Sequence, residues 1–133
     1  MQGKLFTDGG ARGNPGPAAI GGVLYNENQE EIASFSEYIG ETTNNQAEYR
    51  ALLKGLELAL EKKLEELACF LDSELVVKQL NKEYRVKDAE LAKLFVKIWN
   101  LSQQFKVISF SHVRREFNKE ADRLVNQALD NNI

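Results

Sequence analysis

Three apolar or alternating segments near the start of the chain predict three neighbouring strands. The first runs from Lys4 to Asp8, the second from Ala18 to Tyr25 and the third from Glu31 to Ile39. A period of two places one row of side chains on a core and the other row toward solvent. Because only short turns separate these segments, we expect the three strands to form an antiparallel meander.

A helical pattern follows the cap-forming cluster at residues 42–45 and continues to about Lys62. Small residues recur in it at every fourth position and allow the helix to approach a sheet closely. This small-residue row consists of Ala47, Ala51, Gly55 and Ala59.

The second half of the chain alternates strands and helices. Residues 67–71 form a continuous apolar run that ends at Asp72. Such a run is typical of a strand that is buried on both faces in a parallel arrangement. The remaining predicted elements are helices at 73–81 and 89–104, a strand at 106–113 and a last helix capped by Asn118. The only tryptophan, Trp99, is expected in the core. The pattern therefore predicts an α/β fold with helices flanking the sheet.

Composition limits the possible classes of protein. At 133 residues, with 43% hydrophobic and 28% charged residues, the chain predicts a single globular domain covering residues 1–133. The only cysteine, Cys69, has no partner for an internal disulfide, which suits a reducing compartment. Neither a signal sequence nor a membrane-spanning run is evident. We therefore expect a cytoplasmic protein without membrane association, and nothing indicates an obligate protein partner.

Charge is distributed unevenly, although the net charge is only −3. Residues 1–80 carry 7 basic and 13 acidic side chains, whereas residues 81–123 carry 10 basic and 6 acidic side chains. The later segment can therefore form a local basic surface for nucleic acid while the whole chain remains acidic.

Four acidic residues stand where strands end or helices begin, each beside apolar neighbours. They are Asp8, Glu48, Asp72 and Asp122. Taken alone, Asp8 could cap a simple glycine-rich turn, and Glu48 could be an acid favoured by the helix dipole. Gathered on one sheet, the four carboxylates would repel one another unless cations lay between them. Oxygen ligands favour Mg²⁺ or Mn²⁺, and two such ions ~4 Å apart promote phosphodiester displacement.

The motifs around these acids resemble those of a type 1 ribonuclease H over nearly the whole chain. The matching segments are Thr7-Asp8-Gly9-Gly10 with Gly13-Asn14-Pro15-Gly16, Thr42-Thr43-Asn44-Asn45-Gln46-Ala47-Glu48, Leu71-Asp72-Ser73 and Asn118-Lys119-Glu120-Ala121-Asp122. The resemblance implies a five-stranded mixed sheet, with three antiparallel strands followed by two parallel ones. It also implies metal-dependent endonucleolytic cleavage of the RNA strand of RNA–DNA hybrids, which leaves 5′-phosphate and 3′-hydroxyl ends.

The resemblance also assigns roles to individual residues. Asp8 and Asp72 would be shared by two Mg²⁺ ions, for which Mn²⁺ can substitute, while Glu48 and Asp122 would each complete one site. Contacts with the substrate are implied for the following residues: Gly9, Gly10, Asn44 and Asn45 near the RNA 2′-hydroxyl, and Asn14 and Thr43 on the DNA strand. Thr43 and Asn44 can equally be helix caps.

Several features depart from the family pattern. The connection after Asp72 is too short for the basic protrusion of longer members, so hybrid binding would depend on other cations. The candidates are Arg85, Lys87, Arg114 and Arg115, which are equally consistent with solvated loops. The only histidine, His112, falls inside a predicted strand, where we expect it to be packed rather than to act as the family's mobile loop histidine. Glu41 stands where some relatives carry an arginine for the pocket that holds a phosphate of the DNA strand, and its negative charge would repel that phosphate.

Two other functions remain open from the sequence alone. A non-catalytic nucleic-acid-binding module could retain the same fold, but clustered acids would not help it to bind a polyanion. A nuclease or integrase-like relative acting on another substrate, such as duplex RNA, would retain the acids and is compatible with the short connection after Asp72.

Overall fold

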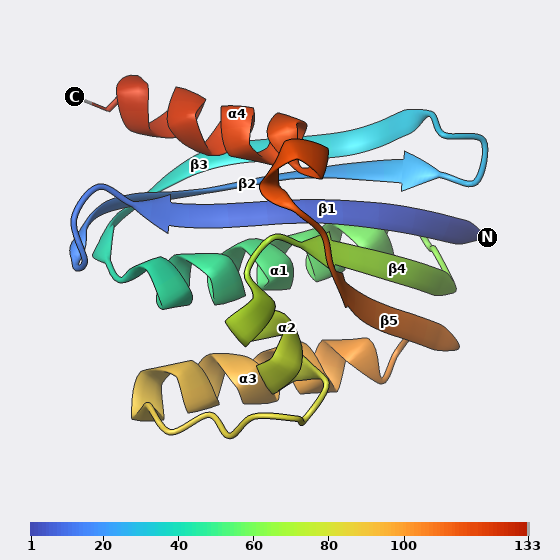
Figure 1. Cartoon of the computed structure of the whole chain (residues 1–133). Coiled ribbons are helices and arrows are strands. Elements are labelled where there is room, and N and C mark those ends of the chain that lie inside the picture. Colours follow the sequence, from blue (N-terminus) through green and yellow to red (C-terminus); the bar gives the residue numbers. More distant parts are fainter. Residues whose placement is uncertain (133) are drawn as a thin grey trace.

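A computed structural model describes residues 1–132 and contains one five-stranded mixed sheet with the strand order β3-β2-β1-β4-β5 (Figure 1). The strands are β1 (Gln2–Ala11), β2 (Gly16–Asn26), β3 (Glu31–Thr42), β4 (Glu66–Leu71) and β5 (Val107–His112). The first three strands are antiparallel, and β4 and β5 add in parallel to β1. The predicted α/β class and mixed sheet are confirmed.

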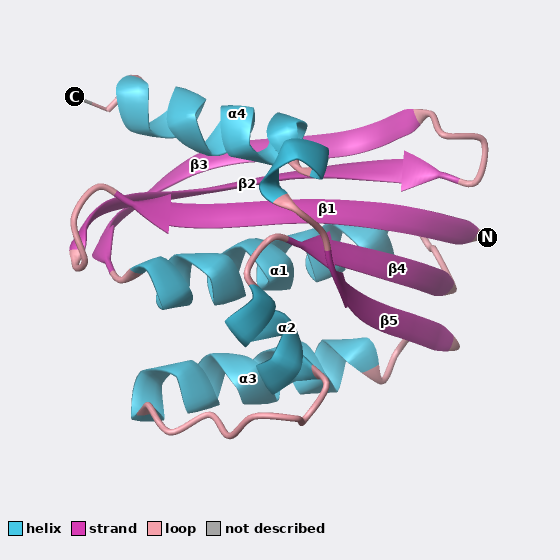
Figure 2. Ribbon diagram, viewed as in Figure 1, coloured by secondary structure: helices cyan, strands magenta, loops and turns pink. Residues whose placement is uncertain are grey.

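Helices cover both faces of this sheet, as Figure 2 shows. They are α1 (Asn44–Glu61), α2 (Glu74–Leu80), α3 (Ala89–Ser102) and α4 (Lys119–Asp130), with a single 3₁₀ turn, η1 (Arg115–Phe117), before α4. Helix α1 packs on β1 and β2 with α3 outside it, whereas α4 lies on the opposite face over β1, β2 and β3 (Figure 1). None of the helices within residues 1–132 has the length and apolar character needed to cross a bilayer.

The main core lies between the sheet and helices α1 and α3. Leu5 of β1 and Leu52 and Leu56 of α1 are fully buried in one cluster. A Cβ atom on Gly55 would lie only 2.6 Å from Leu5 Cδ2, so the helix axis could not come this close with a larger residue there. This contact confirms that the small-residue row of α1 faces the sheet.

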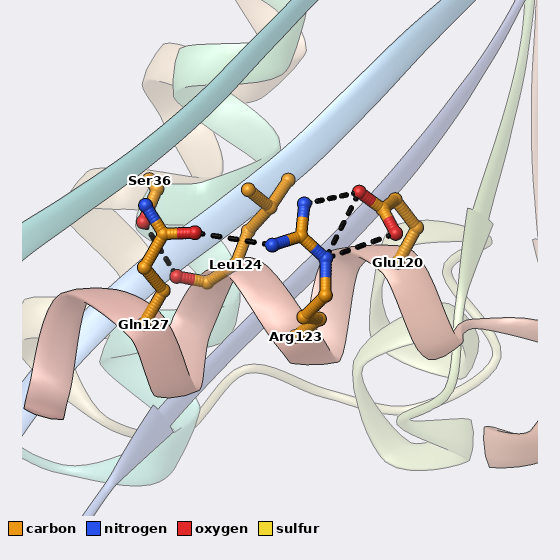
Figure 3. A network of polar contacts seen from close by, with 5 residues as sticks. All are labelled: Ser36, Glu120, Arg123, Leu124 and Gln127. Atoms are coloured by element: carbon orange, nitrogen blue, oxygen red, sulfur yellow. Dashed lines mark hydrogen bonds and ion pairs between the residues drawn. The ribbon is translucent and has the colours of Figure 1, made fainter.

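Helix α4 is fixed against β2 and β3 by a close backbone approach and a cross-element hydrogen bond. A Cβ atom on Gly21 would lie 2.7 Å from the Ala121 carbonyl oxygen, and the Ser36 hydroxyl donates to the Leu124 carbonyl oxygen at 2.6 Å. On the solvent side, Arg123 donates to Glu120 and Gln127 along the helix (Figure 3). Because that network is exposed, it adds little stability, and Gly21 and Ser36 determine where α4 lies.

The prediction that Trp99 lies in the core is wrong. Its side chain is 41% exposed, and the Lys82 ammonium group lies 3.7 Å from the centre of its ring. The core side of α3 is occupied by Leu91 and Ile98, and Trp99 follows Ile98 by a helical rotation of about 100°. That rotation carries the indole to the edge of the helix, where it forms a cation–π contact instead.

Candidate metal centre

Asp8 and Asp72 are brought together by the parallel pairing of β1 and β4. The last paired residues are Thr7 and Leu71, so the two aspartates follow directly on adjacent strands. Strand β1 does not end at Asp8, as the sequence predicted, but continues to Ala11 through its pairing with β2. Because β4 stops at Leu71, β1 loses its neighbour on that side, and the sheet opens where the two carboxylates stand.

Glu48 enters this opening from α1 because Gly9 allows the helix to touch the strand. A Cβ atom on Gly9 would lie 2.3 Å from the carbonyl carbon and oxygen of Ala47, a distance that no side chain could accommodate. The Gly9 amide then donates to Glu48 Oε1 at 3.0 Å. Glu48 lies beyond the first turn of α1 and is only 6% exposed, so the helix dipole does not explain its presence.

The carboxylates converge from three directions. Asp8, Glu48 and Asp72 each offer an oxygen within 4.8 Å of the others. Asp122 comes from α4, on the other face of the sheet, and lines the same cavity of about 370 Å³. The structure therefore brings all four predicted acids to one cavity, with three of them in a tight cluster and Asp122 beside it.

The electrostatics of this cluster are unfavourable without a cation. Burial is the main reason that the pKa of Asp8 is raised to about 7; the adjoining Glu48 carboxyl opposes this effect, and the charges of Asp72 and Asp122 add to it. Burial and then the charge of Asp8 likewise raise the pKa of Glu48 well above its usual range. Among residues 1–132, none of the ion pairs includes any of these four carboxylates.

The donor set fits a hard divalent cation. All the candidate ligands are carboxylate oxygens, and Glu48 Oε2 is buried without a hydrogen-bond partner. An unpaired buried carboxylate oxygen is costly, and a metal ion would satisfy it. The donor set therefore fits a divalent cation better than a set of structural salt bridges.

Asn118 has a different role from the helix cap that the sequence predicted. It occupies the cap position of α4, yet its side chain makes no capping bond, which forgoes about 1 kcal/mol. Instead, its Nδ2 donates to the Thr7 carbonyl oxygen at 2.9 Å and to Asp72 Oδ2 at 3.1 Å, and the residue is only 2% exposed. Sequence analysis missed this contact with Asp72; its position four residues before Asp122 was the one available signal.

The glycine-rich turn and the start of α1 are joined by the predicted asparagines. The backbone N–H of Asn44 donates to Asn14 Oδ1 at 3.0 Å, and Asn44 Oδ1 accepts from the backbone N–H of Ala11 at 2.7 Å. Thr43 Oγ1 accepts from the Gln46 amide at 3.2 Å, which confirms its role as the cap of α1. Of the predicted substrate residues, those that line the acidic cavity are Gly9, Gly10, Asn44 and Arg115. Asn45 lies half-buried in the first turn of α1.

The predicted basic residues are not gathered at one place. Arg115 lines the cavity from η1, whereas Arg114 is exposed and lies 3.8 Å from Glu116. Arg85 and Lys87 are exposed in the connection between α2 and α3, outside the cavity lining. Sequence analysis did not single out Arg12, which also lines the cavity and pairs with Asp130 at 2.6 Å.

His112 is in a strand, as predicted, but it is not packed. It is the last residue of β5, pairs with Leu71 in the sheet and is exposed. The two residues before it on the same face of the strand, Ile108 and Phe110, pack against the core. Strand β5 extends to His112 beyond that cover, so the imidazole is left in solvent.

Known proteins with the same fold match almost the whole chain. The "Reverse transcriptase-like" family model matches residues 6–128. A bifunctional protein of Mycobacterium tuberculosis is 44% identical over 131 residues, which make up 98% of this chain and 36% of that protein. The chain thus spans about a third of the length of that relative.

Two solved structures extend the similarity to three dimensions. Ribonuclease H1 of Halobacterium salinarum has 40% identity and a TM-score of 0.96, with 98% of this chain and 99% of that chain covered. LC11-RNase H1, isolated from compost and solved in complex with an RNA/DNA hybrid, has 45% identity and a TM-score of 0.91, with 97% of both chains covered. Because the similarity in sequence and in structure extends over nearly the whole chain, this chain belongs to the ribonuclease H family, in its compact type 1 form.

Proposed function

We propose that the protein is a metal-dependent endoribonuclease that hydrolyses the RNA strand of RNA–DNA hybrids and leaves 5′-phosphate and 3′-hydroxyl ends. The observation that carries this proposal is the cluster of Asp8, Glu48 and Asp72, whose oxygens lie within 4.8 Å of one another and have no basic side chain paired with them. The hybrid bound to LC11-RNase H1 supports the choice of substrate. The free, buried thiol of Cys69 suits the reducing cytoplasm, where we place this activity.

The four carboxylates would share two Mg²⁺ ions, and Mn²⁺ is a possible substitute. Asp8 and Asp72 would belong to both ions, Glu48 to one and Asp122 to the other. When bound, the ions lower the pKa of water and offset charge on the attacking and leaving oxygens. The protein's own contribution is to hold these oxygens in place, because Asp8 lies inside a paired strand and Glu48 accepts a bond from the Gly9 amide.

Discrimination of RNA from DNA would come from the residues at the cavity edge. The 2′-hydroxyl distinguishes the two backbones, and Gly9, Gly10 and Asn44, which line the cavity, would sense it together with Asn45, the next residue of α1. Asn14 is bonded to the Asn44 amide, so the turn proposed to hold the DNA strand is tied to the start of α1. This bond keeps the two strand-binding segments at a constant separation.

Basic residues would supply the contacts with phosphates. Of these predicted basic residues, Arg115 is the one that lines the cavity itself. Arg114, Arg85 and Lys87 would reach phosphates farther along the hybrid. Each phosphate contact that is removed should lower the slope of log affinity against log salt by about 0.9, so binding measured over a salt series tests each cation separately.

The decisive experiment is a cleavage panel of RNA–DNA hybrid, duplex RNA and duplex DNA, in Mg²⁺ and in Mn²⁺, with the product ends identified. We expect cleavage of the hybrid only, with 5′-phosphate products. Glu48→Gln should lose at least about 10³-fold in rate, whereas Glu61→Gln, an exposed glutamate at the end of the same helix, should not change it. Binding without cleavage by the wild-type protein would favour the non-catalytic module, and equal cleavage of duplex RNA would favour the broader nuclease.

A further inference from the structure

Asn118 connects strand β1 to Asp72, the residue that follows β4. Its Nδ2 donates to the carbonyl oxygen of Thr7, the residue before Asp8, and to Oδ2 of Asp72. We propose that Asn118 is a positioning residue that orients the Asp72 carboxylate and thereby sets the affinity of the site for divalent cations. This inference rests on the proposed function of the carboxylate cluster.

The amide can adopt only one orientation. Both of its neighbours, the Thr7 carbonyl oxygen and the Asp72 carboxylate, are hydrogen-bond acceptors, so the NH₂ group must face them. Its two hydrogens are then both used, and rotation of the side chain would break both bonds. The Asn118 Oδ1 atom is buried without a partner, so nothing competes for a different orientation.

Asp72 needs such a donor more than its neighbours do. It follows the last paired residue of β4, so no strand hydrogen bond holds its backbone on the β1 side, and it is more exposed than Asp8 or Glu48. Glu48 is held by the Gly9 amide through one oxygen, which leaves its Oε2 for a ligand. Asn118 holds Asp72 through Oδ2 in the same way and leaves Oδ1 for the cation. Partners of metal ligands typically change metal affinity 10- to 100-fold when they are removed.

The test compares Mn²⁺ binding to the free protein by calorimetry, in the wild type and in Asn118→Ala and Asn118→Ser. We expect both variants to fold and to raise the dissociation constant for Mn²⁺ about 10-fold. The Mn²⁺ concentration that half-saturates hybrid cleavage should rise in parallel. Asn81→Ala is the matched control, because Asn81 also donates its amide to a backbone oxygen of another element, that of Phe110 at 3.0 Å, but lies outside the acidic cavity. It should lower thermal stability and leave Mn²⁺ binding unchanged.

Three results would overturn the inference. They are an unchanged dissociation constant in Asn118→Ala, an equal weakening in Asn81→Ala, and failure of Asn118→Ser to fold. The last result would mean that the amide maintains the fold as a whole rather than one carboxylate. If the wild-type protein itself bound no Mn²⁺, the proposed function would fail and this inference with it, so the two failures can be told apart.

Discussion

The carboxylates and the cations of this protein are held in opposite ways. Asp8, Glu48 and Asp122 stand on a strand and two helices, and Asp72 directly follows β4. Asp8 and Glu48 are buried, and the close backbone contact of Gly9 with Ala47 sets how α1 meets β1 there. The basic residues proposed to bind substrate stand on connections and are exposed. Arg114, for example, is 80% exposed and has only a 3.8 Å contact with Glu116.

This difference matches what each group must do. Ligands for a metal ion must be fixed to within a few tenths of an ångström, which requires rigid elements packed on both sides. A polyanion can be bound by charges that move, because attraction to phosphates falls off slowly with distance. We therefore expect changes at the acidic centre to have large effects on stability and activity, and changes at the basic rim to have small ones.

The largest effect should follow from Gly9→Ala. The added Cβ atom would lie 2.3 Å from the Ala47 carbonyl, so the start of α1 must move away from β1 and carry Glu48 with it. We expect a loss of about 3 kcal/mol or more in the free energy of unfolding, measured by urea denaturation. Gly10→Ala is the stability control, because its nearest neighbour would be Val125 Cγ1 at 3.9 Å, an ordinary contact. Equal stability of the two variants would show that α1 is not held by this approach.

The second effect is a gain in stability when Asp8 is neutralised. Folding raises the pKa of Asp8 from 3.8 to about 7, so between these values the folded state binds more protons than the unfolded state. The free energy of unfolding of the metal-free protein should therefore fall as pH rises through this window. In EDTA at pH 8, Asp8→Asn should be more stable than the wild type by about 2 kcal/mol, or roughly 7 °C in Tm.

That gain should shrink toward pH 4, where Asp8 is protonated in the folded state and the unfolded-state carboxyl approaches its own pKa of 3.8. Saturating Mn²⁺ should reverse it, because metal binding stabilises only the protein that keeps its ligands. Melting curves at several pH values, with and without Mn²⁺, provide the measurement. A wild type that is more stable than Asp8→Asn in EDTA at pH 8 would contradict the electrostatic account of the cluster.

The acidic centre and the elements that carry it could largely be predicted from the sequence. The strands, α1 and the four acids could be predicted because each depends on local signals, such as an apolar run that ends in Asp72 or a small-residue row that begins at Ala47. The bond from Asn118 to Asp72 could not be predicted. Whether the Asn118 side chain caps α4 or donates to Asp72 depends on residues that lie 46 and 111 positions away in the sequence. Trp99 and His112 were wrongly expected to be packed for a related reason. Exposure at a helix edge or a strand end depends on which other elements cover it.

At the rim, Arg115→Ala should have the largest effect. Arg115 lines the acidic cavity, so we expect it to contact the phosphate that undergoes cleavage. We expect kcat/KM for the hybrid to fall about 10-fold, which corresponds to about 1.4 kcal/mol, with thermal stability unchanged. Arg114→Ala, one residue away but outside the cavity lining, should cost about 2-fold or less. Equal losses in the two variants would mean that only the total charge of this loop matters.

The smallest effect should follow from His112→Ala. The imidazole is exposed at the end of β5 and does not line the acidic cavity. Its neighbour is Glu74, whose pKa is lowered first by its ion pair with Lys78 and then by His112. A residue that carried protons for the reaction would change the pH dependence of kcat near its own pKa, since histidine titrates near pH 6.5. We therefore expect kcat within about 2-fold of the wild type and a superimposable pH profile between pH 6 and 9. A loss of 10-fold or more with an unchanged melting temperature would show that His112 takes part in the reaction, and the division between a buried acidic centre and an exposed rim would then fail at this strand end.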